Sequence, residues 1–263
     1  MQREPQANDK TDDAKESTLS LPGYEIVGVL GTGGMSTVYK ARQEQMARIV
    51  AIKVLHAHLS RDFVHLQRFK QEARLSTMLE HPNIAKLYAF STTQDGQLYL
   101  VIEYCEGQTL REMIEKNRSF SWPQIQEIFQ QICAGVGHAH SHGVVHRDLK
   151  PANVFIEVNS LEKFDVKLID FGIAKIDAGD PEMQKLTQTG VIVGSPHYMS
   201  PEQCTGEKVD GRADIYAIGC MLYHVLSGRP PFNGESHFEL AQKHVAAMPP
   251  PLSEICATID PEL

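Results

Sequence analysis

The feature that most limits the fold of this chain is a change in pattern at about residues 103–108. Before it, short β-rich runs occupy residues 24–30, 36–41, 48–55, 84–91 and 97–103. After it the pattern is mostly helical. Ser121 and Gln124 form a capping-box signature, and an apolar stripe at helical spacing runs from Ile125 to Val136. A β-rich segment followed by a helical segment predicts an α+β protein with two lobes.

One helix is predicted inside the β-rich part, at residues 63–79. Phe69, Glu72 and Leu79 share one face of this helix, which we expect to point inward. Pro82 ends the helix, because the residue before a proline avoids the helical conformation. The helix therefore carries one acidic side chain, Glu72, into the interior of the first lobe.

The composition excludes several classes of protein. A chain of 263 residues with 42% hydrophobic side chains can bury a sizeable core. The formal net charge of −8 provides no basic surface for nucleic acid or an anionic membrane. No apolar run reaches the ~18 residues of a membrane span, and five cysteines without a C-x-x-C pair make neither a disulfide framework nor a zinc site. We therefore expect a cytoplasmic domain without nucleic-acid or membrane contacts.

A glycine-rich turn lies between the first two predicted strands. It consists of Gly31, Thr32, Gly33, Gly34, Met35 and Ser36. Glycine places no Cβ in the way, so such a turn can bring backbone N–H groups close to phosphate oxygens. No Gly-Lys-Ser/Thr follows, which excludes a Walker A loop. Taken alone, the turn fits a phosphate-binding loop and an ordinary hairpin about equally well.

Lys53 is a lone lysine inside an apolar predicted strand, residues 48–55. A buried ammonium group is costly unless an acidic partner lies beside it. Glu72, on the inward face of the predicted helix, is the natural partner. A lysine at the edge of a sheet is the alternative that the strand alone leaves open.

The run from His146 to Asn153 is the most specific signal in the sequence. It places Asp148, Lys150 and Asn153 within eight positions, and Asp170-Phe171-Gly172 follows a short predicted strand that aims Asp170 at the same place. Aspartate and asparagine oxygens are the hard ligands that Mg²⁺ prefers. The order along the chain is a glycine turn, a strand lysine, a helix glutamate, Asp-x₄-Asn and Asp-Phe-Gly.

With these motifs in this order, the chain resembles the protein kinase family over about residues 24–262. The Gly-Gly-Met-Ser turn, the HRDLKPAN run and the SPEQ run resemble the bacterial Hanks-type (PASTA-type) serine/threonine kinases. The resemblance implies a bilobal fold and transfer of the ATP γ-phosphoryl group, with Mg²⁺, to serine or threonine hydroxyls of protein substrates. Rival interpretations are a pseudokinase scaffold, a small-molecule kinase and an interaction module without catalysis.

The resemblance also implies domain boundaries. Residues 1–22 hold few apolar side chains and many charges, and we expect a flexible tail there. The kinase domain would cover residues 23–263, with an N-lobe at 23–104 and a C-lobe at 105–263. The last helices of the family's C-lobe would fall after residue 263, so we expect a truncated C-lobe. A membrane anchor beyond residue 263 stays open.

The roles of individual residues follow from the resemblance. Asp148 would orient the substrate hydroxyl and accept its proton, Lys150 would stabilise the transferring phosphoryl group, and Asn153 and Asp170 would hold Mg²⁺. Lys53 would bind the α- and β-phosphates of ATP. The remaining nucleotide-site residues would be the glycine turn (Gly31, Thr32, Gly33, Gly34, Met35, Ser36), Glu72 through Lys53, the adenine-covering Val38, Ala51 and Phe155, the gatekeeper Ile102, and the hinge residues Glu103 and Cys105.

Two threonines, Thr187 and Thr189, lie in a polar stretch between Asp170 and the Ser-Pro-Glu run. Their Thr-Gln-Thr pattern resembles the place where PASTA-type kinases autophosphorylate. Arg147, directly before Asp148, is able to pair with a phosphate brought in from this segment. We therefore expect Thr187 and Thr189 to be phosphorylated in trans by a second copy, which implies a transient homodimer.

Three histidines, His138, His140 and His142, invite a metal-site interpretation. They fall at the C-terminal end of a predicted helix, where imidazole suits the helix dipole. Their spacing matches no common zinc motif. We therefore favour a structural role.

Overall fold

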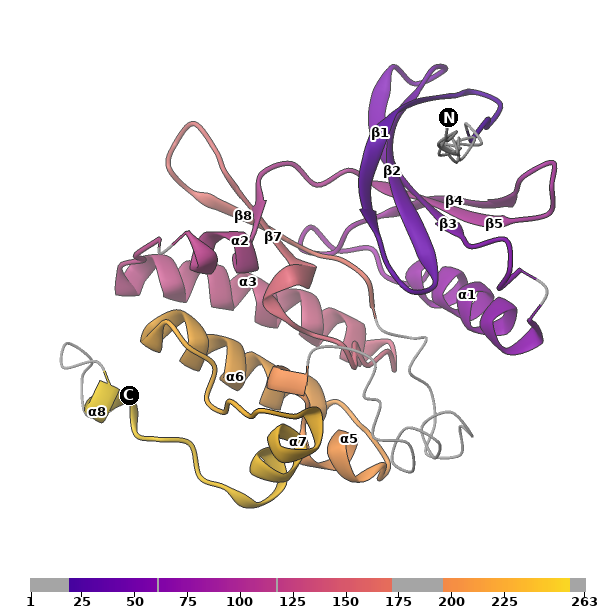
Figure 1. The fold of residues 1–263 in the computed structure, drawn as a ribbon. Helices are drawn as coiled ribbons and strands as arrows, with labels where there is room; N and C mark the ends of the chain where they lie inside the picture. Colours follow the sequence, from indigo (N-terminus) through magenta and orange to yellow (C-terminus); the bar gives the residue numbers. More distant parts are fainter. Residues whose placement is uncertain (1–18, 61, 117, 172–195, 256–263) are drawn as a thin grey trace, which may run out of the picture.

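The structure, a computed structural model, describes residues 19–60, 62–116, 118–171 and 196–255. Within these residues the chain forms two lobes (Figure 1). The N-lobe is a five-stranded sheet in the order β1-β2-β3-β5-β4, with one long helix beside β4 and β5. Its elements are β1 (Tyr24–Thr32), β2 (Ser36–Gln43), β3 (Arg48–Leu55), α1 (Phe63–Ser76), β4 (Leu87–Thr92) and β5 (Leu98–Glu103).

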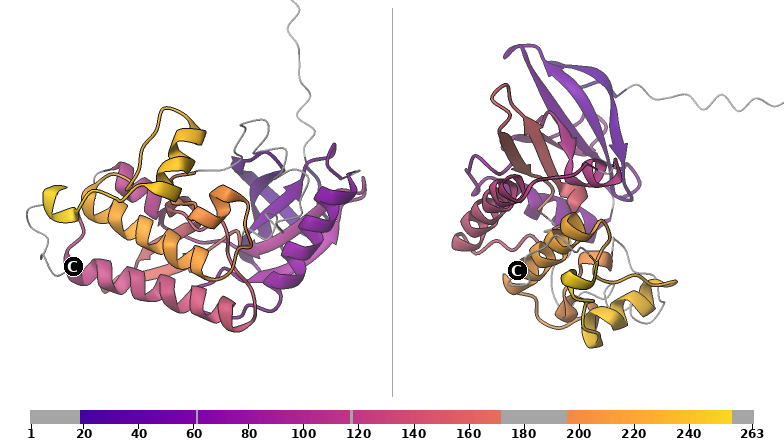
Figure 2. Two further views of the ribbon diagram at one scale, coloured as in Figure 1. Left: turned by 90° about the horizontal axis from the view of Figure 1, so that it is seen from below. Right: turned by 90° about the vertical axis from the view of Figure 1, so that its left-hand side faces the viewer.

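The C-lobe is mostly helical and carries a small three-stranded sheet, β6-β7-β8. Its longest helices, α3 and α6, run side by side (Figure 2). Its elements are β6 (Gln108–Thr109), α2 (Leu110–Glu115), α3 (Trp122–Ser141), η1 (Pro151–Asn153), β7 (Val154–Val158), β8 (Phe164–Leu168), η2 (Pro196–Tyr198), α5 (Pro201–Thr205), α6 (Arg212–Ser227), α7 (His237–Ala246) and α8 (Leu252–Ile255). No helix in the described ranges is long and apolar enough to span a membrane.

Helix α3 is the centre of the C-lobe core. The backbone N–H of Ser121 donates to Gln124 Oε1 at 2.9 Å, which confirms the predicted capping box. The apolar stripe is buried as the helical period predicts; it consists of Ile125, Ile128, Phe129, Ile132 and Val136. The stripe packs in one cluster with side chains of β7 and β8, so α3 supports the two strands that flank the functional loops.

Helix α1 is shorter than the sequence pattern predicts. Asp62 caps its N-terminus by accepting the N–H groups of Val64 and His65. The helix ends at Ser76 instead of Leu79, because the Thr77 hydroxyl donates to the Arg74 carbonyl at 2.6 Å and competes with the helical pattern. Leu79 is nevertheless buried, so the predicted inward face is retained.

The segment after α1 pairs with the C-lobe instead of extending β4. Leu168 N–H donates to the Asn83 carbonyl at 2.9 Å, and Ala85 N–H donates to the Leu168 carbonyl at 2.9 Å. Ile84 therefore bridges β8, and β4 begins at Leu87 rather than at Ile84 as predicted. These bonds tie the N-lobe to the strand that leads to Asp170.

The predicted tail boundary at residue 22 was too late. Leu21 is only 4% exposed and belongs to an apolar cluster with side chains of β2, β3 and β5, and Leu19 packs against this cluster. Tyr24 N–H donates to the Leu21 carbonyl at 3.1 Å. These two leucines, at alternate positions, pack against the sheet and bury apolar surface. The average composition of residues 1–22 does not reveal them. Residues 1–18 of the predicted tail lie outside the described residues.

Two glycines of α3 provide a matched test of how closely this helix approaches β8. A Cβ on Gly135 would lie 2.9 Å from Leu168 Cδ1 and 3.1 Å from the Asn83 carbonyl oxygen, whereas a Cβ on Gly137 would meet nothing within 4 Å. We expect Gly135→Ala to lower the free energy of unfolding by ~1–3 kcal/mol through overpacking. Gly137→Ala should raise it by ~0.5–1 kcal/mol through helix propensity. Urea denaturation of both variants measures the difference, and equal midpoints would contradict the close packing.

Candidate active site

A buried ion cluster joins three elements between the two lobes. Lys53 Nζ, on β3, donates to Glu72 Oε1 of α1 at 2.7 Å and to Asp170 Oδ1, just after β8, at 2.9 Å. The Lys53 and Glu72 side chains are 14% and 11% exposed. The predicted pair of Lys53 and Glu72 is present, so the edge-lysine alternative is wrong. Asp170 is a third member of the cluster.

The cluster fixes the charges of its members. Burial acts to lower the pKa of Lys53, but the carboxylates of Asp170 and Glu72 outweigh it and raise that pKa. The Lys53 ammonium in turn holds the pKa of Asp170 below its ordinary value, despite burial. Burial raises the pKa of Glu72, and Lys53 offsets this only in part. A permanently charged lysine and an ionised Asp170 therefore face the space between the lobes.

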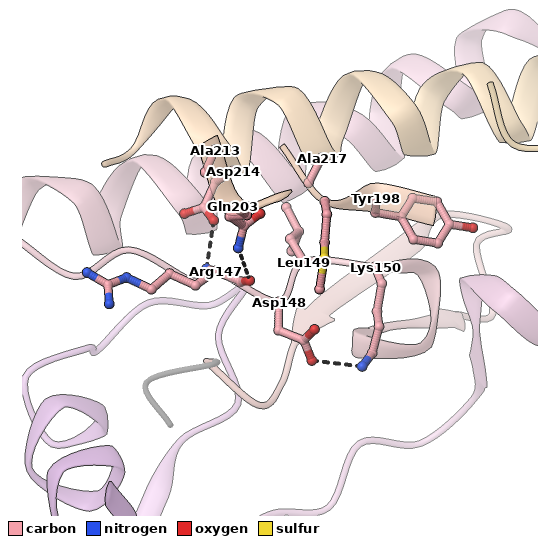
Figure 3. Close-up of a pocket in the computed structure, with 10 residues that line it drawn as sticks. Arg147, Asp148, Leu149, Lys150, Tyr198, Gln203, Ala213, Asp214 and Ala217 are labelled. Atoms are coloured by element: carbon pink, nitrogen blue, oxygen red, sulfur yellow. Dashed lines mark hydrogen bonds and ion pairs between the residues drawn. The ribbon is translucent and has the colours of Figure 1, made fainter. Parts of the chain in front are cut away.

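The second group of functional side chains lies on the loop between α3 and β7. Lys150 Nζ donates to Asp148 Oδ2 at 2.7 Å, so the ammonium group and the carboxylate point toward one another (Figure 3). Asn153 Nδ2 donates to the Asp148 carbonyl at 2.9 Å from the short η1 helix. The structure thus brings Asp148, Lys150 and Asn153 together on one loop.

Asp214, at the start of α6, binds the backbone of the loop between α3 and β7. Its Oδ2 accepts His146 N–H at 2.8 Å, and its Oδ1 accepts Arg147 N–H at 2.9 Å. His140 Nε2 lies 2.7 Å from Oδ2. Burial would raise the pKa of Asp214, but these hydrogen bonds and the nearby His146 hold it below its ordinary value. Asp214 therefore has a structural role, and the structural role predicted for His140 is confirmed. The described residues contain no group of three or more His, Cys, Asp or Glu side chains placed to hold a metal ion among themselves.

His146 and Phe171 form an aromatic contact across the two functional loops. Their ring centroids are 4.5 Å apart, and the His146 side chain is fully buried. Burial lowers the pKa of His146, so the ring is neutral at pH 7. Leu87 of β4 and Phe171 line one small cavity together with other residues of both lobes.

The predicted nucleotide-site residues come from both lobes. Gly31 and Thr32 end β1, Gly33 and Gly34 form the turn, and Gly33 N–H donates to the Ser36 carbonyl at 2.9 Å. Met35 packs on the cluster beneath the turn, and Ser36 is buried at the start of β2. Val38 faces Lys53 across the β2–β3 pair, and Ala51 faces Ile102 across the β3–β5 pair. Phe155 lies on β7 of the other lobe.

The hinge between the lobes is fixed by an ion pair that sequence reasoning missed. Glu103 Oε1 lies 2.7 Å from Lys167 Nζ of β8, and Glu103 Oε2 accepts Lys86 N–H at 3.0 Å. Cys105 follows in the hinge, and burial raises the pKa of its thiol to about 12, so the thiol stays protonated at neutral pH. No periodic signal in the sequence links Glu103 to Lys167, because the two are far apart along the chain.

Asp170 and Asn153 fit a magnesium ion. The bond from Asn153 Nδ2 to the Asp148 carbonyl fixes the orientation of the Asn153 side-chain amide. The Asn153 Oδ1 atom therefore faces away from the Asp148 carbonyl. Asp170 Oδ1 accepts a hydrogen bond from Lys53 Nζ. The Asp170 side chain is 38% exposed, so it remains accessible to an ion from solvent. Two hard oxygen donors suit Mg²⁺, which keeps several water ligands and shares its shell with phosphate oxygens. The other predicted functional positions, Thr187 and Thr189, lie outside the described residues.

Comparison with known proteins places this geometry in a family. The sequence matches the protein kinase domain over residues 24–258, so the chain belongs to the protein kinase domain family. The serine/threonine-protein kinase PknB of Mycolicibacterium smegmatis is 42% identical over 245 residues, which cover 91% of this chain and 38% of that protein. The serine/threonine-protein kinase pkn3 of Myxococcus xanthus is 37% identical over 241 residues, 92% of this chain and 44% of that protein.

A third relative gives the same result. The serine/threonine-protein kinase PknB of Mycobacterium leprae is 41% identical over 234 residues, which cover 88% of this chain and 36% of that protein. This chain therefore spans less than half the length of these three relatives. The resemblance to bacterial Hanks-type kinases and the bilobal α+β fold are confirmed.

Proposed function

We propose that this domain transfers the γ-phosphoryl group of ATP to serine and threonine hydroxyls of protein substrates. The observation that carries the proposal is that two hydrogen-bonded groups of charged side chains include residues of adjacent loops, which Ile169 N–H joins by donating to the Asn153 carbonyl at 3.0 Å. One is the Lys53–Glu72–Asp170 cluster, and the other is the Asp148–Lys150 pair. Phosphoryl transfer needs little covalent chemistry from the protein; it needs positioning and positive charge near the phosphates.

Each side chain has a task in this reaction. Lys53, held by Glu72, binds the α- and β-phosphates, and the glycine turn covers them with backbone N–H groups. Asp148 orients the substrate hydroxyl and accepts its proton as the oxygen bonds to the γ-phosphorus and ADP leaves. Lys150 stabilises the charge on the transferring group. Asp170 and Asn153 would hold Mg²⁺, which would supply positive charge at the phosphate oxygens.

Three observations favour this function over the alternatives. A pseudokinase lacks members of the catalytic set, whereas Lys53, Asp148, Asn153 and Asp170 are all present and are held by hydrogen bonds. Lys150, two residues after Asp148, favours serine and threonine over tyrosine, as the family resemblance implies. The long segment between Gly172 and Glu202 favours a protein substrate over a small molecule, because it builds a protein-substrate platform in the family.

The proposal is tested by incubating the domain with radiolabelled ATP, Mg²⁺ and a generic protein substrate. We expect label to appear on the protein and to disappear when EDTA removes the divalent ion. A matched reaction with small alcohols and sugars tests the small-molecule alternative. ATP binding without turnover would support the pseudokinase, and label on the small molecules alone would contradict a protein kinase.

We also infer that Thr187 and Thr189 are phosphorylated by a second copy of the domain during a transient homodimer encounter. Their position between Asp170 and the Ser-Pro-Glu run supports this, together with the arginine that precedes Asp148. Wild-type protein is incubated with Mg-ATP and an Asp148→Asn copy that carries a mass tag. Phosphate on the tagged peptide 186–190 supports trans phosphorylation. Tagged protein without phosphate there would contradict it.

A further inference from the structure

The backbone immediately before Asp148 adopts an unusual conformation. Arg147 has a φ angle of +63°, in the left-handed region that non-glycine residues rarely occupy. Such a conformation persists only where surrounding contacts hold it. Asp214 supplies one contact, since its Oδ1 accepts Arg147 N–H at 2.9 Å. That bond restrains the peptide between His146 and Arg147. It does not restrain the next peptide, between Arg147 and Asp148.

Gln203 of α5 restrains this next peptide. Its Nε2 donates to the Arg147 carbonyl oxygen at 2.7 Å, and Figure 3 shows Gln203 and Asp214 approaching the Arg147 backbone from the same side. The carbonyl of Arg147 and the N–H of Asp148 belong to one planar peptide. On its N–H side this peptide makes a longer contact, 3.4 Å, with His146 Nδ1. Gln203 therefore makes the shorter of these two bonds, which both act on the peptide plane from which the Asp148 side chain projects.

The orientation of the Gln203 amide is determined by its two partners. Its Oε1 accepts Ser200 N–H at 3.1 Å, which completes the capping box of α5. A backbone N–H only donates and a carbonyl only accepts, so the oxygen must face Ser200 and the nitrogen must face Arg147. Ser200 is fully buried, which keeps the cap in place. One side chain thus connects the start of α5 to the catalytic loop.

We propose that Gln203 is a positioning residue for Asp148: it holds the Arg147–Asp148 peptide and so makes the aim of the catalytic carboxylate depend on the docking of α5. The proposal rests on the proposed phosphoryl transfer. Glutamine is required because the position needs an acceptor for the cap and a donor for the loop. Glutamate would serve the cap equally well but has no proton to donate to the Arg147 carbonyl at neutral pH.

This difference provides the test. Gln203→Glu keeps the cap and removes the donor, whereas Gln203→Met removes both. Gln124→Glu makes the same change in the other Ser-x-x-Gln capping box, that of α3, where the glutamine oxygen accepts Ser121 N–H. The three variants and the wild type are compared by kcat, by KM for ATP and by melting temperature.

We expect kcat to fall about 10- to 100-fold in both Gln203 variants, since misplacement by a fraction of an ångström to 1 Å has effects of this size. KM for ATP should stay within about twofold of wild type, because the Lys53 cluster is untouched. The melting temperature should fall in both Gln203 variants through loss of the bond to the Arg147 carbonyl, and by about a further 2–4 °C in Gln203→Met through loss of the cap. Gln124→Glu should match wild type in all three measurements.

The proposal would be overturned if Gln203→Glu were as active as wild type and if kcat fell only in proportion to the melting temperature. Hydrogen exchange gives a readout that does not depend on catalysis. The peptide 145–150 should exchange faster in Gln203→Glu than in Gln124→Glu, and equal exchange would overturn the proposal even in an inactive preparation. A wild type without transferase activity, but with faster loop exchange in Gln203→Glu, would contradict the proposed function and leave the positioning role supported.

Discussion

Replacement of Asp148 by asparagine should abolish most phosphoryl transfer while the fold and ATP binding stay intact. The change removes the carboxylate that orients the hydroxyl and accepts its proton, and general-base contributions are about 10²- to 10⁴-fold in kcat. An asparagine oxygen still accepts the Lys150 Nζ bond, which is 2.7 Å long in the wild type, so the loop keeps this contact. Initial rates with radiolabelled ATP measure the loss, and equilibrium nucleotide binding measures what is retained.

The matched control for this variant is a carboxylate of the same type outside the site. Asp210→Asn removes an exposed acid whose partner, Arg212, lies on the surface of the C-lobe. We expect its rate to remain within about twofold of wild type, because exposed ion pairs contribute little. A near-normal rate of phosphoryl transfer by Asp148→Asn would contradict the proposed role of Asp148.

Replacement of Lys53 by methionine should have the second-largest effect. The ammonium is the cation of the buried cluster, and loss of one preorganised charge-stabilising group costs about 10²- to 10³-fold in kcat. Glu72→Gln should be milder, since the bond from Lys53 to Asp170 remains. Lys243→Met, on the exposed part of α7, is the matched lysine control. A transfer rate of Lys53→Met equal to that of Lys243→Met would contradict the role of the cluster.

The Lys53→Met variant should also change the pH dependence of the free energy of unfolding. In the wild type Lys53 lowers the pKa of Asp170, so this carboxylate loses its stabilising contribution as the pH falls through its folded pKa. Without the cation, the buried carboxylate of Glu72 lies beside the half-buried carboxylate of Asp170 with no Lys53 ammonium between them. Burial and the neighbouring negative charge should then raise the pKa of Glu72 further above its unfolded value. The variant should therefore gain stability relative to wild type as the pH falls from about 7 toward about 4.5. Parallel melting curves at both pH values would contradict this.

The sequence was sufficient for features that leave a repeating or local pattern. The stripe of α3 repeats at helical spacing, and its five members are buried. The pair of Lys53 and Glu72 could be predicted because a lysine in an apolar strand requires a partner.

Polar contacts between distant segments could not be predicted in this way. Gln203 and Arg147 lie 56 positions apart, and the Ser-x-x-Gln pattern already accounts for the glutamine as a helix cap. Glu103 and Lys167 likewise lie in segments without a shared period. The predicted end of the tail at residue 22 was wrong for another reason. Leu19 and Leu21 lie in a charged stretch, and the average composition of that stretch does not show that two apolar side chains alternate within it.

The central claim is transfer of the ATP γ-phosphoryl group to serine and threonine hydroxyls by the Asp148 site. Phosphoamino-acid analysis of a protein substrate, labelled with wild type and with Asp148→Asn in parallel, tests it most directly. We expect phosphoserine and phosphothreonine in the wild-type reaction, without phosphotyrosine, and a loss of label of about 10²-fold or more in the variant. Label on tyrosine, or equal label from the two proteins, would contradict the account.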